Sequence, residues 1–180
     1  YMRGVRFVQV PTTLTGQVDA AIGGKTAVNL PEGKNLVGTF YQPALVLCDP
    51  EPLATLSDRD YRSGLAEVAK YGLTLDLELL EGLERDPSAV LTRDPAALEP
   101  LVARCVAAKA RTVSEDETDT GQRLILNYGH TLGHALERLE ALLGLDDDPG
   151  GLVPQHAVVA AAVRSVPGLR IGRTGAVIEA

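Results

Sequence analysis

The stretch GLAEVAKYG, residues 64–72, places Glu67 and Lys70 three residues apart in an otherwise apolar run. Residues three apart are neighbours on one face of a helix, where an acid and a lysine form an ion pair worth about 0.2–0.5 kcal/mol. A second stretch, GHTLGHA, places His130 and His134 four apart and therefore also on one helical face. Because carboxylates and imidazoles are zinc ligands, these two stretches raise a metal site as an alternative to the ion pair.

The amino-acid composition limits which classes of protein and which partners are expected. The chain has 180 residues, 45% hydrophobic and 4% aromatic, with a net charge of −7 and a pI near 5. This size fits one large domain or two small ones. The acidic balance argues against nucleic acid or an anionic membrane as a partner. Cys48 and Cys105 lie far apart without CxxC spacing, so neither a disulfide framework nor a thiolate zinc site is expected. This cysteine usage fits a reducing cytoplasm, where we expect the protein. No apolar run reaches the roughly 18 residues of a membrane span.

Strand-like sequence precedes residue 57. VRFVQV, residues 5–10, predicts a strand, and the apolar run ALVLCD, residues 44–49, predicts a second, buried one. Between them, residues 11–43 carry so many Gly and Pro residues that no long regular structure is expected. The opening directly into a strand-like run indicates a fragment.

Helical periodicity follows residue 57. Ser57 and Asp58 can cap a helix that runs through GLAEVAKYG, and further helices are predicted at 76–85, 95–114 and 122–143. The resulting division is 1–56 for a strand-containing part, 57–145 for a helical part and 146–180 for a tail of uncertain structure.

The candidate metal ligands are Glu67 and His130, with His156 or His134 as the third. A catalytic zinc site usually takes three such ligands and keeps one position open. The competing interpretation is a polar helix face, which is the commoner reason for two histidines at helical spacing.

The segment AAIGGKTAVNLPEGKN is similar to a phosphate-binding loop only in part. The loop motif needs a glycine five positions before Gly24, where Asp19 stands. A solvated glycine-rich loop is therefore the simpler interpretation. Six cationic residues nevertheless lie near glycine turns or the candidate metal ligands, and if they converge they form a positive cleft for a phosphorylated or carboxylated substrate. They are Arg3, Lys25, Lys34, Lys70, Lys109 and Arg123. No GxGxxG dinucleotide motif follows a strand in this sequence.

Five separated stretches together resemble 3-dehydroquinate synthase, in that family's order and spacing. They are YMRGVRFVQVPTTLTGQVDAAIGGKTAVN, PEGKNLVGTFYQP, GLAEVAKYG, KARTVSEDE and GQRLILNYGHTLGHALE. The resemblance implies a shikimate-pathway lyase that converts 3-deoxy-arabino-heptulosonate 7-phosphate to 3-dehydroquinate and phosphate. It also implies bound NAD, one divalent metal (zinc or cobalt), a small phosphorylated sugar-acid substrate and a homodimer. The implied fold class is α/β: the C-terminal part of a Rossmann-like NAD-binding domain followed by a mainly α-helical metal-binding domain.

The resemblance also assigns roles to matching positions. Catalytic or substrate-binding positions are Arg3, Lys25, Asn35, Lys70, Lys109, Arg123, Asn127 and His134. Positions that line the NAD pocket are Thr12, Thr13, Asp19, Lys34 and Thr55. The resemblance implies Glu67 and His130 as two of the three metal ligands, and His156 is the candidate for the third. His156 lies in PQHAV, where the family carries an HGEAV-like motif, so it can ligate only after a local shift.

The family's glycine-rich amino-terminal NAD-binding half is absent from this sequence, so we expect an incomplete copy of the enzyme. Three alternatives stay open. One is a related sugar phosphate cyclase with a different substrate, and another is a non-catalytic fragment that folds only with a partner or as a dimer. The third is a hydrolytic zinc enzyme that cleaves esters or peptides without NAD.

Overall fold

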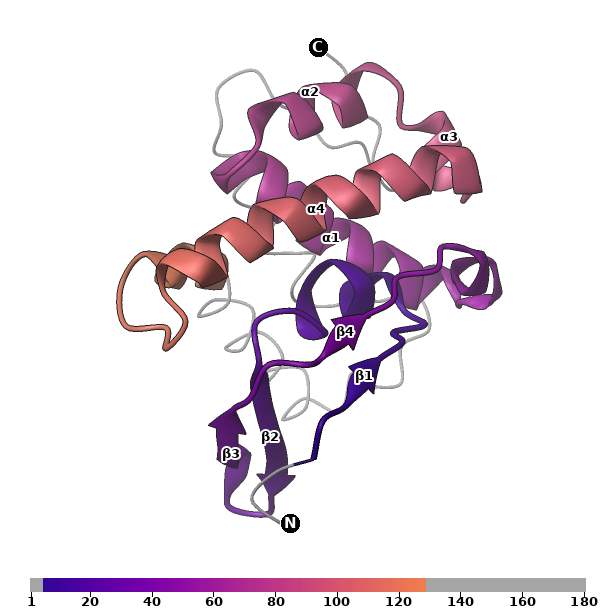
Figure 1. The fold of residues 1–180 in the computed structure, drawn as a ribbon. Coiled ribbons are helices and arrows are strands. Elements are labelled where there is room, and N and C mark those ends of the chain that lie inside the picture. Colours follow the sequence, from indigo (N-terminus) through magenta and orange to yellow (C-terminus); the bar gives the residue numbers. More distant parts are fainter. Residues whose placement is uncertain (1–4, 129–180) are drawn as a thin grey trace.

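Two long helices that cross each other organise the chain (Figure 1). The computed structural model describes residues 5–128. Helix α1 spans Asp58–Thr74 and helix α4 spans Pro95–Glu115. The shorter helices α2 (Leu77–Arg85) and α3 (Ser88–Leu91) lie on one side of α4, and the strands lie on the other. Each helix in this range is too short or too polar to cross a membrane.

The three longest helices begin where the sequence predicts, because each start carries a capping side chain. Ser57, Asp76 and Asp94 each accept a hydrogen bond from a backbone amide two or three residues later, at the starts of α1, α2 and α4. Pro95 occupies the first turn of α4, where its missing N–H costs nothing. These three predicted helices are confirmed. Helix α3 was not predicted, since four residues are too few to show a period.

The predicted helix over 122–143 is wrong for the residues that the structure describes. The 3₁₀ helix η3 spans Gln122–Asn127, and Tyr128 after it leaves the helical conformation. In the preceding turn, the Asp116 carboxylate accepts hydrogen bonds from the backbone amides of Gly121 and Arg123. Residues 129–143 lie outside the described range.

The hydrophobic core comes from the helices and the segments beside them. The 3₁₀ helix η2 (Glu51–Thr55) and the π-helical turn η1 (Gly16–Ala20) also contribute to it. Each fully buried leucine or valine contributes about 1.5–3 kcal/mol relative to an exposed one. Within the described chain, no core member comes from a strand. The core residues are Leu14, Val18, Leu53, Tyr61, Val68, Tyr71, Leu79, Val90, Leu98, Leu101, Val102, Cys105, Ala108 and Leu126.

Gly64 lets α1 pack tightly against the segment that leads into η1. A Cβ at this position would lie 2.4 Å from Leu14 Cβ and 2.9 Å from the backbone nitrogen of Thr15. Because neither atom is the end of a flexible side chain, only glycine fits. This close approach brings the second half of α1, with Glu67 and Lys70, next to η1.

The two predicted strands are present but shorter than expected. β1 (Val8–Gln9) and β4 (Leu45–Val46) form a two-stranded parallel sheet. The second strand was expected to be buried, and this is wrong, because Leu45 and Leu47 are both more than half exposed. Only two residues of each strand pair, and no helix of the described range covers these side chains.

The segment 11–43 contains a long antiparallel hairpin, contrary to the sequence prediction. β2 (Lys25–Leu30) pairs with β3 (Gly33–Phe40), with Val28 opposite Val37. Most of the glycine and proline residues lie before β2 or at the turn, although Gly38 lies within β3. Alternating Thr and Val residues, which favour strands, fill the positions between them.

Candidate substrate and metal site

Three cationic side chains are buried where α1, α4 and η3 pack together. Lys70 is 3% exposed, Lys109 is 6% exposed and Arg123 is 1% exposed. Lysine and arginine are almost never fully buried unless they are paired, and removing a charge from water costs several kcal/mol. Three buried cations close together in a chain of net charge −7 make this cluster the candidate functional site.

Glu67 and Lys70 form the pair that the helical spacing predicts. Both side chains are buried on one face of α1, and Lys70 Nζ lies within ion-pair distance of Glu67 Oε2. The approach lacks hydrogen-bond geometry, however, and neither atom has a hydrogen-bond partner among residues 5–128. A buried carboxylate oxygen and a buried ammonium group that lack hydrogen bonds can each bind a ligand.

Asp19 and Lys109 form a second buried pair that joins η1 to α4. Lys109 Nζ lies 2.6 Å from Asp19 Oδ1 and also donates to the backbone oxygen of Asp19. Burial opposes ionisation of Asp19, but the charges of Lys109 and Lys70 outweigh it and hold the pKa of this carboxyl below its usual range. Burial lowers the pKa of Lys109 more strongly than the charge of Asp19 raises it. Lys70 and Arg123 add to the lowering, so three cations share one electrostatic environment.

Arg123 is held by backbone oxygens from two loops. Its Nη1 donates to the oxygen of Glu117 and its Nη2 to the oxygen of Gly23, each at 2.8 Å. Gly23 has φ +100°, and a Cβ there would lie 2.3 Å from Arg123 Nη2. The glycine before β2 is therefore required for the guanidinium to be buried. Its Nε has no hydrogen-bond partner within the described residues.

The structure thus brings together five of the predicted site residues: Asp19, Glu67, Lys70, Lys109 and Arg123. Three further predicted positions lie outside this cluster. Lys25 is half-exposed on β2 and pairs with Asp119. Asn35 is exposed in β3 with φ 59°, and Asn127 is exposed at the end of η3.

The predicted NAD positions lie around the amino-terminal segment and the hairpin. Thr12 and Thr13 are exposed directly after β1, and Thr13 Oγ1 accepts a hydrogen bond from the Gly16 amide at 3.0 Å. Thr55 is exposed at the end of η2, and Lys34 belongs to β3. Among the NAD positions whose side chains the structure describes, Asp19 alone is linked to the buried cations by contacts within residues 5–128.

Four predicted site residues lie outside the described residues: Arg3, His130, His134 and His156. Within residues 5–128, no group of three His, Cys, Asp or Glu side chains is placed to hold a metal ion. The structure therefore contains one predicted metal ligand, Glu67.

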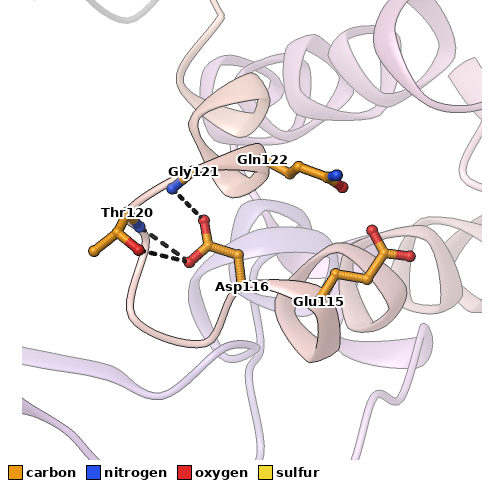
Figure 2. Close-up of a pocket in the computed structure, with 5 residues that line it drawn as sticks. All are labelled: Glu115, Asp116, Thr120, Gly121 and Gln122. Carbon is orange, nitrogen blue, oxygen red and sulfur yellow. Dashed lines mark hydrogen bonds between the residues drawn. The ribbon is translucent and has the colours of Figure 1, made fainter.

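An open pocket of about 490 Å³ lies at the carboxyl end of α4 (Figure 2). Its lining residues are Glu115, Asp116, Thr120, Gly121 and Gln122. Asp116 bridges the turn by accepting hydrogen bonds from the amides of Thr120 and Gly121, and these bonds lower the pKa of its carboxyl. Two carboxylates would repel an anionic substrate. The pocket is therefore not the candidate anion site. It is formed by the turn that positions Arg123.

The sequence prediction missed Tyr71 and Gly23. Tyr71 lies in the quoted stretch GLAEVAKYG, and its hydroxyl reaches Asp19. In a chain with 4% aromatic residues, a tyrosine next to a candidate site lysine was the available signal. Gly23 contacts Arg123, which lies 100 positions later, and no sequence spacing predicts that contact.

Solved structures with this architecture hold a nucleotide and a metal. A 2-deoxy-scyllo-inosose synthase complexed with carbaglucose-6-phosphate, NAD⁺ and Co²⁺ matches 91% of this chain and 42% of its own, with a TM-score of 0.76 and 34% identity. A 2-epi-5-epi-valiolone synthase from Streptomyces hygroscopicus subsp. jinggangensis 5008, with NAD⁺ and Zn²⁺ bound, matches 89% of this chain and 42% of its own, with a TM-score of 0.73 and 34% identity. The chain therefore has the α/β fold of the sugar phosphate cyclases, and the predicted fold class is confirmed.

Within that class, the chain belongs to the 3-dehydroquinate synthase family. The family's N-terminal model matches residues 1–63 and its C-terminal model matches residues 64–145. The 3-dehydroquinate synthase of Pelobacter propionicus is 58% identical over 139 residues, and that of Methylococcus capsulatus is 56% identical over 137. These alignments cover 77% and 76% of this chain, but 39% and 38% of the relatives. The chain thus spans about two fifths of the length of the curated relatives that it matches.

Proposed function

We propose that the chain carries part of the site of a 3-dehydroquinate synthase, which converts 3-deoxy-arabino-heptulosonate 7-phosphate to 3-dehydroquinate and phosphate. Family membership supports the reaction. The structural observation that carries the proposal is the burial of Lys70, Lys109 and Arg123, with only two carboxylates among their close partners within residues 5–128.

The three buried cations are the proposed binding groups for the substrate anions. The four lysines of the chain, Lys25, Lys34, Lys70 and Lys109, are all predicted site positions. Lysines are normally surface residues, yet two of these are among the least exposed side chains of the described range. A substrate with a carboxylate and a phosphate would give them charge-assisted hydrogen bonds, which are stronger than neutral ones. Such a ligand would offset the cost of keeping them out of water.

Glu67 is the proposed metal ligand of this part of the chain. Its buried Oε2 lacks a hydrogen-bond partner within the described range, and a carboxylate is a suitable ligand for Zn²⁺ or Co²⁺. His130 and His156 are the other proposed ligands. A divalent cation, when bound, supplies Lewis-acid polarisation of a substrate hydroxyl. Lys70 would then bind and orient the anionic substrate beside Glu67.

Asp19 is the proposed link to NAD, together with Thr12, Thr13, Lys34 and Thr55. The nucleotide, when bound, supplies reversible hydride acceptance. The lowered pKa keeps Asp19 ionised, so its carboxylate is an acceptor for hydroxyl groups. The role of this chain is to hold and orient substrate and nucleotide relative to each other.

The homodimer is proposed on the same family basis. The cytoplasmic location is proposed from the cysteine usage, and the division at residues 56/57 and 145/146 from the change in sequence pattern. Sedimentation velocity on the purified chain tests the first. A single species with the mass of one chain would contradict it.

Calorimetric titration tests the proposed substrate class. We expect 3-deoxy-arabino-heptulosonate 7-phosphate to bind at least tenfold more tightly than glucose 6-phosphate, because only the former carries a carboxylate for the buried cations. Lys109→Met should weaken that binding by roughly tenfold or more, since hydrogen bonds to charged groups are worth about 1.5–3 kcal/mol. Arg111→Met is the matched control, because Arg111 is an exposed cation on the same helix. Equal effects of the two variants would contradict the proposed site.

Two alternatives predict other results, the first in this titration and the second in an assay of phosphate release. Preference for glucose 6-phosphate would favour a cyclase with a different substrate, as in the structural relative that holds a carbaglucose phosphate. Substrate binding without phosphate release in the presence of NAD and zinc would favour a non-catalytic fragment. This alternative stays open because the chain matches only 39% of the length of the Pelobacter propionicus relative.

A further inference from the structure

Tyr71 connects the helix that carries Glu67 and Lys70 to the turn that carries Asp19. Its side chain is fully buried in the core. Its hydroxyl lies 3.0 Å from the backbone oxygen of Val18 and 3.1 Å from Asp19 Oδ1, so one O–H is shared between two acceptors on η1. The hydroxyl is thus a direct polar contact between the proposed metal helix and the proposed nucleotide segment.

The contacts on Asp19 fix the orientation of its carboxylate. Within residues 5–128, Tyr71 and Lys109 both contact Oδ1, which leaves Oδ2 available to a ligand. The Asp19 side chain is 24% exposed, whereas Lys109 beside it is nearly buried. Burial and then the charge of Asp19 raise the pKa of Tyr71, so the phenol stays protonated and remains a donor.

We propose that Tyr71 is a positioning residue for nucleotide binding: it acts through Asp19, and together with Lys109 it orients the carboxylate so that Oδ2 accepts a hydroxyl group of NAD. This inference rests on the proposed function, because that function assigns Asp19 to the NAD pocket. This role requires no direct contact between Tyr71 and the substrate or the nucleotide. Its role is to fix the position of η1 relative to α1. The nucleotide-binding and metal-binding parts of the site then keep a fixed distance and orientation.

The chain contains a matched control for the loss of a buried phenol hydroxyl. Tyr61 also lies on α1, is also in the core, and its hydroxyl donates to the Val90 backbone oxygen at 2.6 Å. Tyr61→Phe and Tyr71→Phe each remove one oxygen and keep the ring. Since each loses a buried hydrogen bond, both variants should lose similar thermal stability. Only Tyr71→Phe removes a contact with Asp19.

The test uses the full chain and has two readouts. The first is the titration of the Asp19 carboxyl carbon by NMR, assigned with Asp19→Asn. The charged and titratable groups around Asp19 are Lys109, Lys70 and Tyr71. Because a hydrogen bond to the ionised form lowers a pKa, Tyr71→Phe should raise the pKa of Asp19 while Tyr61→Phe leaves it unchanged. The second readout is the Kd for NAD, which should increase roughly threefold to tenfold in Tyr71→Phe, the factor expected for one hydrogen bond, and by less than twofold in Tyr61→Phe.

The outcomes separate this inference from the proposed function. An Asp19 pKa that is the same in wild type and Tyr71→Phe overturns the positioning role, whether or not NAD binds. A raised pKa with an unchanged Kd for NAD, or equal Kd changes in the two variants, overturns the nucleotide role. If the wild-type chain has no affinity for NAD, the proposed cofactor fails and the nucleotide role fails with it, while the Asp19 titration still decides whether Tyr71 positions that carboxylate.

Discussion

The helices and the strands of the described chain differ in how they are stabilised. All core side chains come from the helices and adjoining segments, whereas Val28 and Val37, opposite each other in the hairpin, are 57% and 56% exposed. The hairpin has its own backbone hydrogen bonds but contributes no side chain to the core. Local stability in a protein follows such differences in apolar burial. The helices therefore form the stability-determining part, and the hairpin is an attached part.

The largest difference is expected for leucine truncation in the two parts. Leu98 in α4 is fully buried, so Leu98→Ala should lower the free energy of unfolding by about 2–5 kcal/mol. Leu36→Ala in β3 makes the same chemical change at an exposed position and should change it by less than about 0.5 kcal/mol. Urea unfolding followed by circular dichroism measures both. Similar losses would show that the hairpin is part of the cooperative core.

Glycine-to-alanine substitutions should have opposite signs at two helical positions. Gly64→Ala places a Cβ against Leu14 and Thr15 and should destabilise the chain by about 1–3 kcal/mol. Gly82→Ala in α2 meets no atom within 4 Å and should stabilise it by about 0.5–1 kcal/mol, since alanine favours helix over glycine. Thermal melts of both variants give the comparison. A stabilising Gly64→Ala would contradict the tight contact between α1 and the segment before η1.

The smallest effect on global stability is expected at the links between the hairpin and the helices. Asp119→Asn removes the partner of Lys25 and should cost less than about 1 kcal/mol, as is usual for partly exposed ion pairs. It should nevertheless accelerate hydrogen exchange of the backbone amides in β2 and β3. Glu78→Gln, which removes an exposed partner of Arg104 within the helical part, is the control and should leave hairpin exchange unchanged. Unchanged exchange in Asp119→Asn would mean that other contacts attach the hairpin.

The helical part could be predicted from sequence because its signals are local. The caps Ser57, Asp76 and Asp94 and the apolar periodicity after them lie within a few residues of the structure they specify. The hairpin was missed because the glycine and proline residues of segment 11–43 were interpreted as breakers of the whole segment. Strand pairing depends on partners that periodicity does not identify, such as Val28 with Val37.

The candidate site shows the same limit. The spacing of Glu67 and Lys70 predicts their contact, which the structure contains. The contact between Asp19 and Lys109 joins residues 90 positions apart, and the Arg123 bond to Gly23 spans 100. Family resemblance assigned roles to Asp19, Lys109 and Arg123, but it did not predict these contacts or the part that Tyr71 plays in them. Long-range contacts depend on the packing of α1, α4 and η1, which only the folded chain shows.

The most direct test of the proposed site is the zinc content of the purified chain beside Glu67→Gln, after equilibration with Zn²⁺ and removal of excess metal. Glu81→Gln, an exposed acid on α2, is the matched control, and circular dichroism verifies that all three proteins are folded. Wild type and Glu81→Gln should each hold about one zinc per chain, as a three-ligand site would, and Glu67→Gln should hold much less. Equal zinc in all three proteins, or none in wild type, would contradict the assignment of Glu67 as a metal ligand.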